Sequence, residues 1–371
     1  MSSLLSSGWS GFRNRLLAQP GFQRWAADFP LTRRIAHQRT AALFDRVAGF
    51  VYSQIVLACV QLRALETLAN SPQSAPALAD LWAMPEDSAL RLLRAAAALE
   101  LVEERAEGRF GLGPTGAVLL GNPGLRQMIA HHGLFYADLV DPVALLRAGG
   151  GAKGLSAFWP YAAAENASDS QAEEVSPYSA LMAATQPGVA ADVLAAYNPR
   201  RHRRLLDVGG GEGVFAAAAA RAAQKLSVAV FDLPAVAARA KANFDAQGLR
   251  GRAQSFGGDF LAGPLPEGFD LITLVRILHD HDDAGVRAIL HRIRQALAPG
   301  GRLVIAEPMS AAPKPDPVSD AYFGLYLLAM GRGRARRPAE LKAFLREAGF
   351  RRFSMPSTRS PMLLRVLVAG A

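Results

Sequence analysis

The stretch RRLLDVGGGEGVFAAAAARAA, residues 203–223, decides the fold of this chain. Its apolar residues Leu205, Leu206 and Val208 predict a short buried strand, which three consecutive glycines follow directly. The alanine-rich residues after them predict a helix. In such a strand–turn–helix unit, backbone N–H groups and the amino end of the helix face a ligand. Glycines are needed in the turn because a Cβ atom would hold the ligand away from the backbone.

The residues around this turn favour one of two nucleotide-containing cofactors. A dinucleotide fingerprint is G-x-G-x-x-G, and here Gly209 and Gly211 supply the first two glycines but Val214 stands at the third position. Asp207 lies two residues before the first glycine, where a carboxylate suits a cationic cofactor without phosphates. We therefore expect S-adenosylmethionine. The alternative is a tight turn that binds nothing, although three adjacent glycines weaken a strand end unless another group approaches closely.

Length and composition predict two domains in a reducing compartment. The chain has 371 residues, half of them hydrophobic, and its single cysteine allows no internal disulfide. The polar linker ENASDSQAEEVS separates a predicted amino-terminal helical domain, residues 1–165, from a catalytic domain, residues 166–371. We find no signal-peptide pattern and no uninterrupted apolar stretch of the ~20 residues that cross a bilayer. The expected location is cytoplasmic.

The net charge of +9 is concentrated in two places, at residues 13–46 and 332–352. In the first, seven arginines alternate with aromatic and aliphatic side chains, against only Asp28 and Asp45. Such a pattern suits an anionic membrane surface, and it suits a partner subunit equally well. An ordinary solvated face in an arginine-rich chain is the third interpretation.

Residues 78–120 predict two helices and a short hairpin at 109–120, which is the order of elements in a winged helix. A winged helix can place a helix in a DNA groove. Here the candidate recognition helix carries only Arg91 and Arg94 against five acidic residues, which is poor chemistry for phosphate neutralisation. We therefore expect a dimerisation domain and no nucleic-acid binding. The apolar helix predicted over 47–69 has more apolar surface than one domain needs, which favours a homodimer.

The carboxyl-terminal half alternates predicted strands and helices. Strands are predicted within 226–234, 252–260, 269–278, 302–309 and 362–370. Repeated β–α units predict an α/β, Rossmann-like doubly wound sheet, mostly parallel. Ligands in such folds bind beyond the carboxyl ends of the strands. The candidate functional residues lie at the carboxyl ends of predicted strands; they are Gly209, Asp232, Asp259, His279 and Glu307.

Each of these positions has a plausible chemical role. The carboxylate of Asp232 can accept hydrogen bonds from both hydroxyls of a ribose. Asp259 can read an adenine amine while Phe260 covers the ring, although both aspartates could instead cap helices. A neutral imidazole at His279 can take a proton from a substrate hydroxyl as that hydroxyl attacks a methyl group.

The segment HDHDD, residues 279–283, also allows a metal interpretation. It directly precedes a predicted helix, so Asp282 and Asp283 are explained as the cap and a first-turn acid. We therefore favour His279 as a general base and expect no metal.

The motifs DVGGGEG, FDLP, GGDF, RILHDHDD, IAEPM and RRPAELKAFLREAGF, in this order, resemble the plant-type (caffeate-like) S-adenosylmethionine-dependent O-methyltransferases. The resemblance covers about residues 45–371. It implies that His279 is the catalytic base and that Glu307 helps to orient it. It also implies a cofactor pocket whose residues include Gly209, Gly211, Asp232, Asp259 and Phe260; we assign Asp207 and Arg276 to the same pocket. The chain departs from the family at His281, where a tryptophan is usual, and near Ala335, where a second carboxylate is usual.

Residues 9–36 and 43–60 narrow the resemblance to the carotenoid O-methyltransferases of purple photosynthetic bacteria. Those enzymes methylate the tertiary hydroxyl of an acyclic hydroxycarotenoid such as hydroxyneurosporene or demethylspheroidene. The resemblance implies a hydrophobic acceptor, lined by residues 321–330, and an enzyme peripheral to the photosynthetic membrane. Core packing alone would also explain 321–330. Two other functions stay open, a methyltransferase for a bacteriochlorophyll-type macrocycle or aromatic polyketide, and a non-enzymatic winged-helix regulator.

Overall fold

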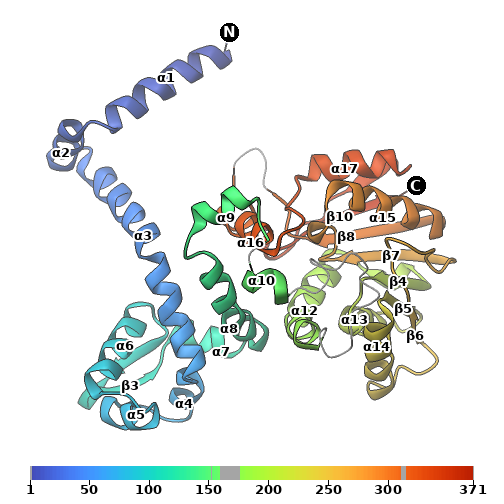
Figure 1. Ribbon diagram of the computed structural model, residues 1–371, viewed down its shortest axis with the longest axis horizontal. Coiled ribbons are helices and arrows are strands. Elements are labelled where there is room, and N and C mark those ends of the chain that lie inside the picture. Colours follow the sequence, from blue (N-terminus) through green and yellow to red (C-terminus); the bar gives the residue numbers. More distant parts are fainter. Residues whose placement is uncertain (1, 152, 159–175, 311–314, 371) are drawn as a thin grey trace. The chain divides into compact units, whose positions relative to one another are not determined.

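The computed structural model describes residues 2–151, 153–158, 176–310 and 315–370 (Figure 1). The chain divides into two compact units, Met1–Gly121 and Asn122–Ala371. The boundary expected between residues 165 and 166 lies outside the described residues. The helices between residues 123 and 158 therefore belong to the same unit as the large sheet, not to the amino-terminal one.

The first unit is helical with a small sheet. It contains helices α1 (Ser2–Leu17), α2 (Pro20–Asp28), α3 (Arg33–Gln61), α4 (Ala64–Asn70), α5 (Ala75–Leu81), α6 (Glu86–Ala98) and α7 (Pro114–Leu120), and strands β1 (Gln73–Ser74), β2 (Val102–Arg105) and β3 (Arg109–Leu112). The strands pair antiparallel in the order β1-β3-β2, which completes the wing expected from the sequence.

The hairpin lies earlier in the chain than the sequence predicted. Its first strand, β2, takes residues that we expected at the end of the preceding helix, because Glu100 adopts φ +58° and α6 ends at Ala98. Residues 114–120 form helix α7 instead of a strand, because Pro114 fixes the first turn of a helix.

Helix α3 is long and apolar enough to cross a membrane, by length and composition, with a mean hydropathy of 1.5 over its most apolar window. It is not an uninterrupted apolar stretch, because charged residues lie in its amino-terminal half. Only 11% of that window is buried. The exposed apolar side chains of α3 therefore need a covering surface.

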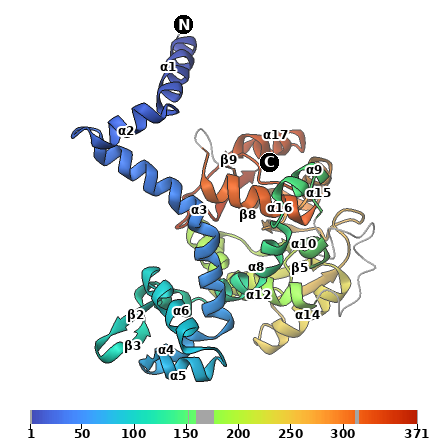
Figure 2. The ribbon, with the colours of Figure 1, turned by 60° about the vertical axis from the view of Figure 1, so that its left-hand side comes forward.

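The second unit contains a seven-stranded sheet with helices on both faces (Figure 2). Its helices are α8 (Pro123–Asp138), α9 (Pro142–Ala148), α10 (Lys153–Phe158), α12 (Ser176–Ala196), α13 (Val214–Ala222), α14 (Pro234–Ala246), α15 (Asp283–Ala296), α16 (Phe323–Met330) and α17 (Pro338–Glu347). Its strands are β4 (Arg204–Val208), β5 (Ser227–Asp232), β6 (Ala253–Gly257), β7 (Phe269–Val275), β8 (Leu297–Glu307), β9 (Arg352–Ser354) and β10 (Arg365–Gly370).

The strand order is β6-β5-β4-β7-β8-β10-β9, and β4 to β8 are parallel, which confirms the predicted doubly wound sheet. Strand β10 runs antiparallel to β8, and β9, which the sequence analysis missed, pairs with β10 at the edge. Two apolar clusters cover the faces of the sheet. The order reverses at β4, so the loops after β4 and β7 diverge there and leave room for a ligand at the carboxyl edge.

Candidate active site

The turn after β4 has the close backbone approaches that its glycines predict. Gly209 adopts φ +69°, and a Cβ atom there would lie 2.4 Å from Cδ1 of Ile277. Gly211 adopts φ +57°, and apart from its chain neighbours no atom of the described residues lies within 4 Å of its Cβ position. The turn is therefore packed on one side at Gly209 and open at Gly211, as a ligand-binding turn should be.

Asp232, at the end of β5, holds this turn in place. Its Oδ2 accepts a hydrogen bond from the N–H of Gly211 (2.8 Å), and its Oδ1 accepts one from the N–H of Leu233 (2.8 Å). Each carboxylate oxygen keeps further acceptor capacity. Burial raises the pKa of Asp232 to about 6, although the two N–H donors oppose the shift. The side chain thus shapes the turn and can still accept hydrogen bonds from a ligand.

Asp207 is almost fully buried beneath the same turn. Its Oδ1 accepts a 2.6 Å hydrogen bond from the hydroxyl of Thr273, while its Oδ2 has no hydrogen-bond partner among the described residues. That free oxygen points at Gly210, since a Cβ atom there would lie 2.7 Å from it. Burial raises the pKa of Asp207 to about 7. A nearby cationic ligand would favour its ionised form.

The loop after β6 places Asp259 and Phe260 near the turn. Oδ1 of Asp259 accepts a hydrogen bond from the N–H of Leu261 (2.7 Å), so this carboxylate orders its own loop. Phe260 lies 3.6 Å from the Cβ position of Gly209, and its ring meets the ring of His281 edge to face, with centroids 5.5 Å apart. A ring surface thus borders the glycine turn even though the chain has histidine where the family has tryptophan.

His279 lies between the buried carboxylate of Glu307 and the partly exposed carboxylate of Asp280. It belongs to the short helix η4 (Leu278–Asp280), immediately beyond β7, and its side chain is only 10% exposed. Its Nδ1 lies 3.5 Å from Oε2 of Glu307, at the end of β8, and the same oxygen accepts a hydrogen bond from the N–H of His279 (3.2 Å). Its Nε2 lies 3.2 Å from Oδ1 of Asp280.

These carboxylates control the charge of His279. Burial by itself lowers the pKa of His279, but Asp280 and Glu307 together outweigh it, so that the pKa lies above its usual value of 6.5. Burial also raises the pKa of Asp280. The arrangement stabilises an imidazolium, the species that forms when a histidine takes a proton. Asp280 was not predicted to face His279, because in the sequence it is only one of several acids in HDHDD.

Arg276 lies at the same edge of the sheet but its guanidinium contacts protein groups. It donates to the hydroxyl of Thr185 (2.9 Å) and to Oε1 of Gln186 (2.7 Å), both on α12, and its backbone adopts φ +61°. The side chain that we assigned to the cofactor pocket therefore ties α12 to the end of β7. These bonds position Arg276 beside the pocket without using its charge on a ligand.

Arg336 supports η4 through hydrogen bonds to its backbone, and in the sequence it is only one residue of an arginine-rich loop. It is fully buried and donates to the backbone carbonyls of Leu278 (2.7 Å) and His281 (2.6 Å) and to Oδ1 of Asp283 (2.9 Å). Where the family usually has a second carboxylate, this chain thus has Ala335 followed by a buried cation that holds the backbone of the catalytic loop.

The HDHDD segment behaves as a helix start. Asp282 is the N-cap of α15 and accepts a hydrogen bond from the N–H of Gly285 (2.7 Å), and Asp283 lies in the first turn, as expected. No group of three or more metal-ligating side chains is found in the part of the chain that the structure describes.

An aromatic cluster adjoins the site within the same unit. It is built from α8, α9, α10 and α16; its buried members are Phe135, Leu145, Leu155, Tyr326, Leu327, Ala329 and Met330. Met182, whose carbonyl accepts from Arg276, and Ala335, which precedes Arg336, also pack against it. The cluster is therefore linked to the segment around His279 through Arg276, which bonds Met182, and through Arg336, which follows Ala335.

The polar groups inside this cluster satisfy one another. Nε2 of His131 lies 3.0 Å from the hydroxyl of Tyr326, and Nε2 of His132 lies 2.7 Å from that of Tyr322. Burial lowers the pKa of His131 to about 4, so this imidazole is neutral at physiological pH. The adjacent histidines thus belong to an uncharged aromatic wall.

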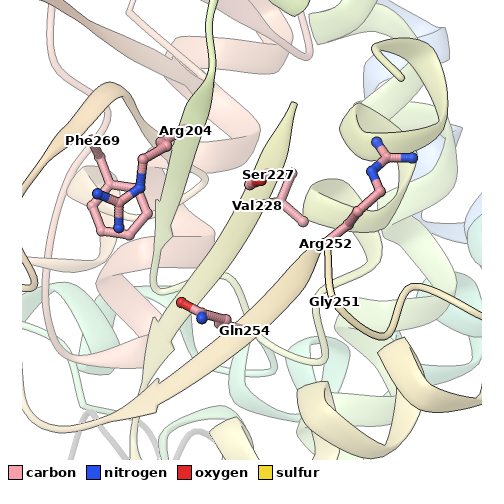
Figure 3. A pocket seen from close by; sticks show the side chains of 7 residues that line it. All are labelled: Arg204, Ser227, Val228, Gly251, Arg252, Gln254 and Phe269. Atoms are coloured by element: carbon pink, nitrogen blue, oxygen red, sulfur yellow. The ribbon is translucent and has the colours of Figure 1, made fainter. Parts of the chain in front are cut away.

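A small pocket lies at the opposite edge of the sheet (Figure 3). Its lining residues come from the amino ends of β4 to β7; they are Arg204, Ser227, Val228, Gly251, Arg252, Gln254 and Phe269. The Arg204 guanidinium stacks on Phe269, and Arg252 donates to three backbone carbonyls. These cations already have partners, and this pocket is not at the edge that carries the acid–base residues.

Comparison with known proteins identifies the family. Residues 136–351 match the model of the O-methyltransferase domain, and residues 44–122 match that of the O-methyltransferase dimerisation domain. The chain belongs to the S-adenosylmethionine-dependent O-methyltransferase family. The first match covers more than half of the chain, and the second covers the winged-helix unit together with the carboxyl-terminal part of α3.

Similar proteins agree with this assignment. The chain is 43% identical to a demethylspheroidene O-methyltransferase of Cereibacter sphaeroides, over 92% of this chain and 90% of that one. It is 41% identical to the demethylspheroidene O-methyltransferase of Rhodobacter capsulatus, over 92% and 84%. The structure of the mitomycin 7-O-methyltransferase MmcR is similar, with a TM-score of 0.75, 25% identity and coverage of 91% and 99%. This O-methyltransferase is therefore an enzyme, which rules out the non-enzymatic regulator.

The site fits S-adenosylmethionine, the methyl donor of the family. The turn at Gly211 is open, Asp207 has a buried oxygen without a partner among the described residues, and Asp232 keeps acceptor capacity. Carboxylates without a matching cation suit a ligand that carries positive charge. Asp207, Gly209, Gly211, Asp232 and Phe260 would hold it.

Proposed function

We propose that this O-methyltransferase methylates the tertiary hydroxyl of an acyclic hydroxycarotenoid, with His279 as the general base. The observation that carries the chemistry is the position of His279, at the carboxyl edge of the sheet between Glu307 and Asp280. Two relatives of the chain, 43% and 41% identical to it, are demethylspheroidene O-methyltransferases, which supports the acceptor class.

The residues of this chain would act on the acceptor hydroxyl. S-adenosylmethionine, when bound, supplies an electrophilic methyl carbon on a sulfonium. An aliphatic alcohol is too weak an acid to ionise first, so its proton must leave as the new carbon–oxygen bond forms. His279 takes that proton, and Glu307 and Asp280 stabilise the imidazolium. General-base help of this kind contributes about 10²–10⁴-fold to the rate.

The aromatic cluster supports a long apolar acceptor. Its members are aliphatic or aromatic, its histidines and tyrosines are paired, and it adjoins the His279 loop through Met182 and Ala335. An uncharged wall of this kind disfavours acceptors with ionised groups, because desolvating a charge there would be costly. Of residues 321–330, which were predicted to line the acceptor site, Tyr322, Phe323 and residues 325–330 form part of this wall.

The enzyme would work as a homodimer. The support is the match to a dimerisation domain and the exposed apolar side chains of α3 inside that match, among them Phe44 and Val47 at 65% and 70% exposure. Burying such side chains against a second copy removes apolar area from water, which is favourable.

A single-turnover assay tests the proposal. The enzyme is mixed with S-adenosylmethionine and a hydroxylated acyclic carotenoid in detergent micelles, and the methyl ether is detected by mass spectrometry. We expect product from the wild type and at least a 100-fold slower reaction from His279→Ala, with unchanged S-adenosylmethionine affinity by calorimetry. A rate within a few-fold of wild type would remove His279 as the base. Turnover of an aromatic polyketide or macrocycle but not of the carotenoid would replace the acceptor.

A further inference from the structure

The amino-terminal part of the first unit exposes aromatic side chains beside arginines. We call residues 9–43, which belong to α1, α2 and the start of α3, the basic aromatic segment. Trp9 is 67% exposed, Trp25 51% and Ile35 55%. The ring of Trp25 stacks on that of Phe29, with centroids 4.9 Å apart. Apolar side chains that remain this exposed indicate a contact surface.

The charge of the segment has one sign. It contains six exposed arginines, at positions 13, 15, 24, 33, 34 and 39, and a single acidic residue, Asp28. The structure gives none of these arginines an ion pair with a described residue, and the bonds of Arg13 go to the neutral side chain of Asn14. The electrostatic potential at this surface is therefore positive, and it would attract an anionic partner.

A second copy of the chain fits this segment less well than an anionic surface does. The match to the dimerisation domain begins only at residue 44, so residues 9–43 lie outside the part of the chain that this domain covers. A twofold interface through the segment would bring two surfaces of the same sign together, and like charges across an interface are unfavourable. An oppositely charged partner with an apolar layer beneath its charge fits better.

We propose that the basic aromatic segment binds the surface of an anionic lipid bilayer. Arginines meet anionic headgroups, while tryptophan and phenylalanine rings enter the boundary between headgroups and acyl chains. The segment thus makes the enzyme a peripheral membrane protein. This inference stands on the surface alone and does not require that the acceptor is a carotenoid.

Vesicle co-sedimentation of the full-length enzyme tests it. The vesicles are phosphatidylcholine alone, or phosphatidylcholine with 30% phosphatidylglycerol. We expect sedimentation only with the anionic vesicles, decreasing as salt is raised because ions screen the contacts. The double variant R34E/R39E should bind at least about tenfold more weakly. The control variant R147E/R201E makes the same change in net charge at two exposed arginines of the second unit. It should bind like the wild type.

Tryptophan fluorescence adds a second readout. Trp9 and Trp25 should give a blue shift of emission with anionic vesicles, and W9F/W25F should remove it. The proposal is overturned if the intact enzyme fails to sediment, or if R147E/R201E loses as much binding as R34E/R39E. It is also overturned if the wild type does not bind vesicles and deleting residues 2–43 turns the dimer into a monomer. In that case the segment belongs to the interface between copies.

Discussion

At the scale of single residues, the pairing of His279 with Asp280 determines a pH dependence. The base must be neutral to accept a proton, and its pKa is raised above 6.5 because the nearby carboxylates outweigh burial. Activity should therefore rise with pH through a value above 6.5 and level off beyond it. In Asp280→Asn one of the raising charges is lost, so the rise should move to lower pH.

The pH profile of kcat/KM, measured from pH 5 to 9 with the wild type and Asp280→Asn, checks this prediction. The plateau rate of the variant should also fall, about tenfold or more, because the imidazolium loses a stabilising neighbour. Asp282→Asn is the control, since that side chain only caps α15. An acid limb at the same pH in wild type and Asp280→Asn would mean that Asp280 does not face the base.

Asp232 gives a second residue-scale prediction, for binding. Its raised pKa of about 6 means that the carboxyl is increasingly neutral below that pH and loses its preference for hydrogen-bond donors. Affinity for S-adenosylmethionine should thus fall as pH drops through about 6.

A charged hydrogen bond contributes about 1.5–3 kcal/mol, so Asp232→Asn should bind at least about tenfold more weakly at pH 7.5. Calorimetry at pH 5 and 7.5 checks both statements, and unchanged affinity of the variant would place Asp232 outside the pocket.

At the scale of elements, Arg336 shows how a distant loop positions η4. Arg336→Met would leave the carbonyls of Leu278 and His281 without their buried donor. Leaving a buried hydrogen-bond acceptor without a donor costs about 1–3 kcal/mol. We expect a clear fall in melting temperature and in kcat, with little change in S-adenosylmethionine affinity.

The neighbouring arginine is the matched control. Arg334 also pairs with Asp283, but its side chain is 43% exposed, and exposed pairs contribute about 0–1 kcal/mol. Arg334→Met should therefore melt near the wild type. Arg336→Lys keeps the charge but not the planar fork, so its kcat should lie between those of wild type and Arg336→Met. Equal effects of Arg334→Met and Arg336→Met would contradict a positioning role for Arg336.

The sequence predicted elements best where the pattern is local. The strand before Gly209 and the cap at Asp282 follow from apolar runs, glycines and helix signals within a few residues. The hairpin was misplaced because a left-handed residue at Glu100 ended a helix whose composition would have allowed it to continue. Asp280 and Arg336 could not be assigned from pattern, because their roles depend on which side chains the fold brings together.

At the scale of the whole molecule, the two units carry different tasks. The second unit contains the seven-stranded sheet, the acid–base residues at its carboxyl edge and the aromatic cluster on neighbouring helices. The first unit has a winged-helix topology whose exposed helix α3 is apolar, and the part of it that matches the family model belongs to dimerisation. Assembly and chemistry are therefore encoded in separate stretches of sequence, and substitutions should separate them.

The final prediction tests that separation. On α3, Phe44, Val47, Phe50 and Val51 lie inside the dimerisation match, are each at least 55% exposed and recur at helical spacing, so they form one apolar stripe. In a twofold interface a single substitution acts on both copies. Val47→Glu should raise the dimer dissociation constant by about 30-fold or more, since a disrupted central position costs at least about 2 kcal/mol. Sedimentation velocity at micromolar concentration measures it. Val140→Glu makes the same change at a site of 83% exposure outside the dimerisation match, and should leave the dimer intact. If the wild type and both variants all sediment as monomers, something other than a second copy covers α3. Because α3 is long enough to cross a membrane, its binding to lipid vesicles would then be the next measurement.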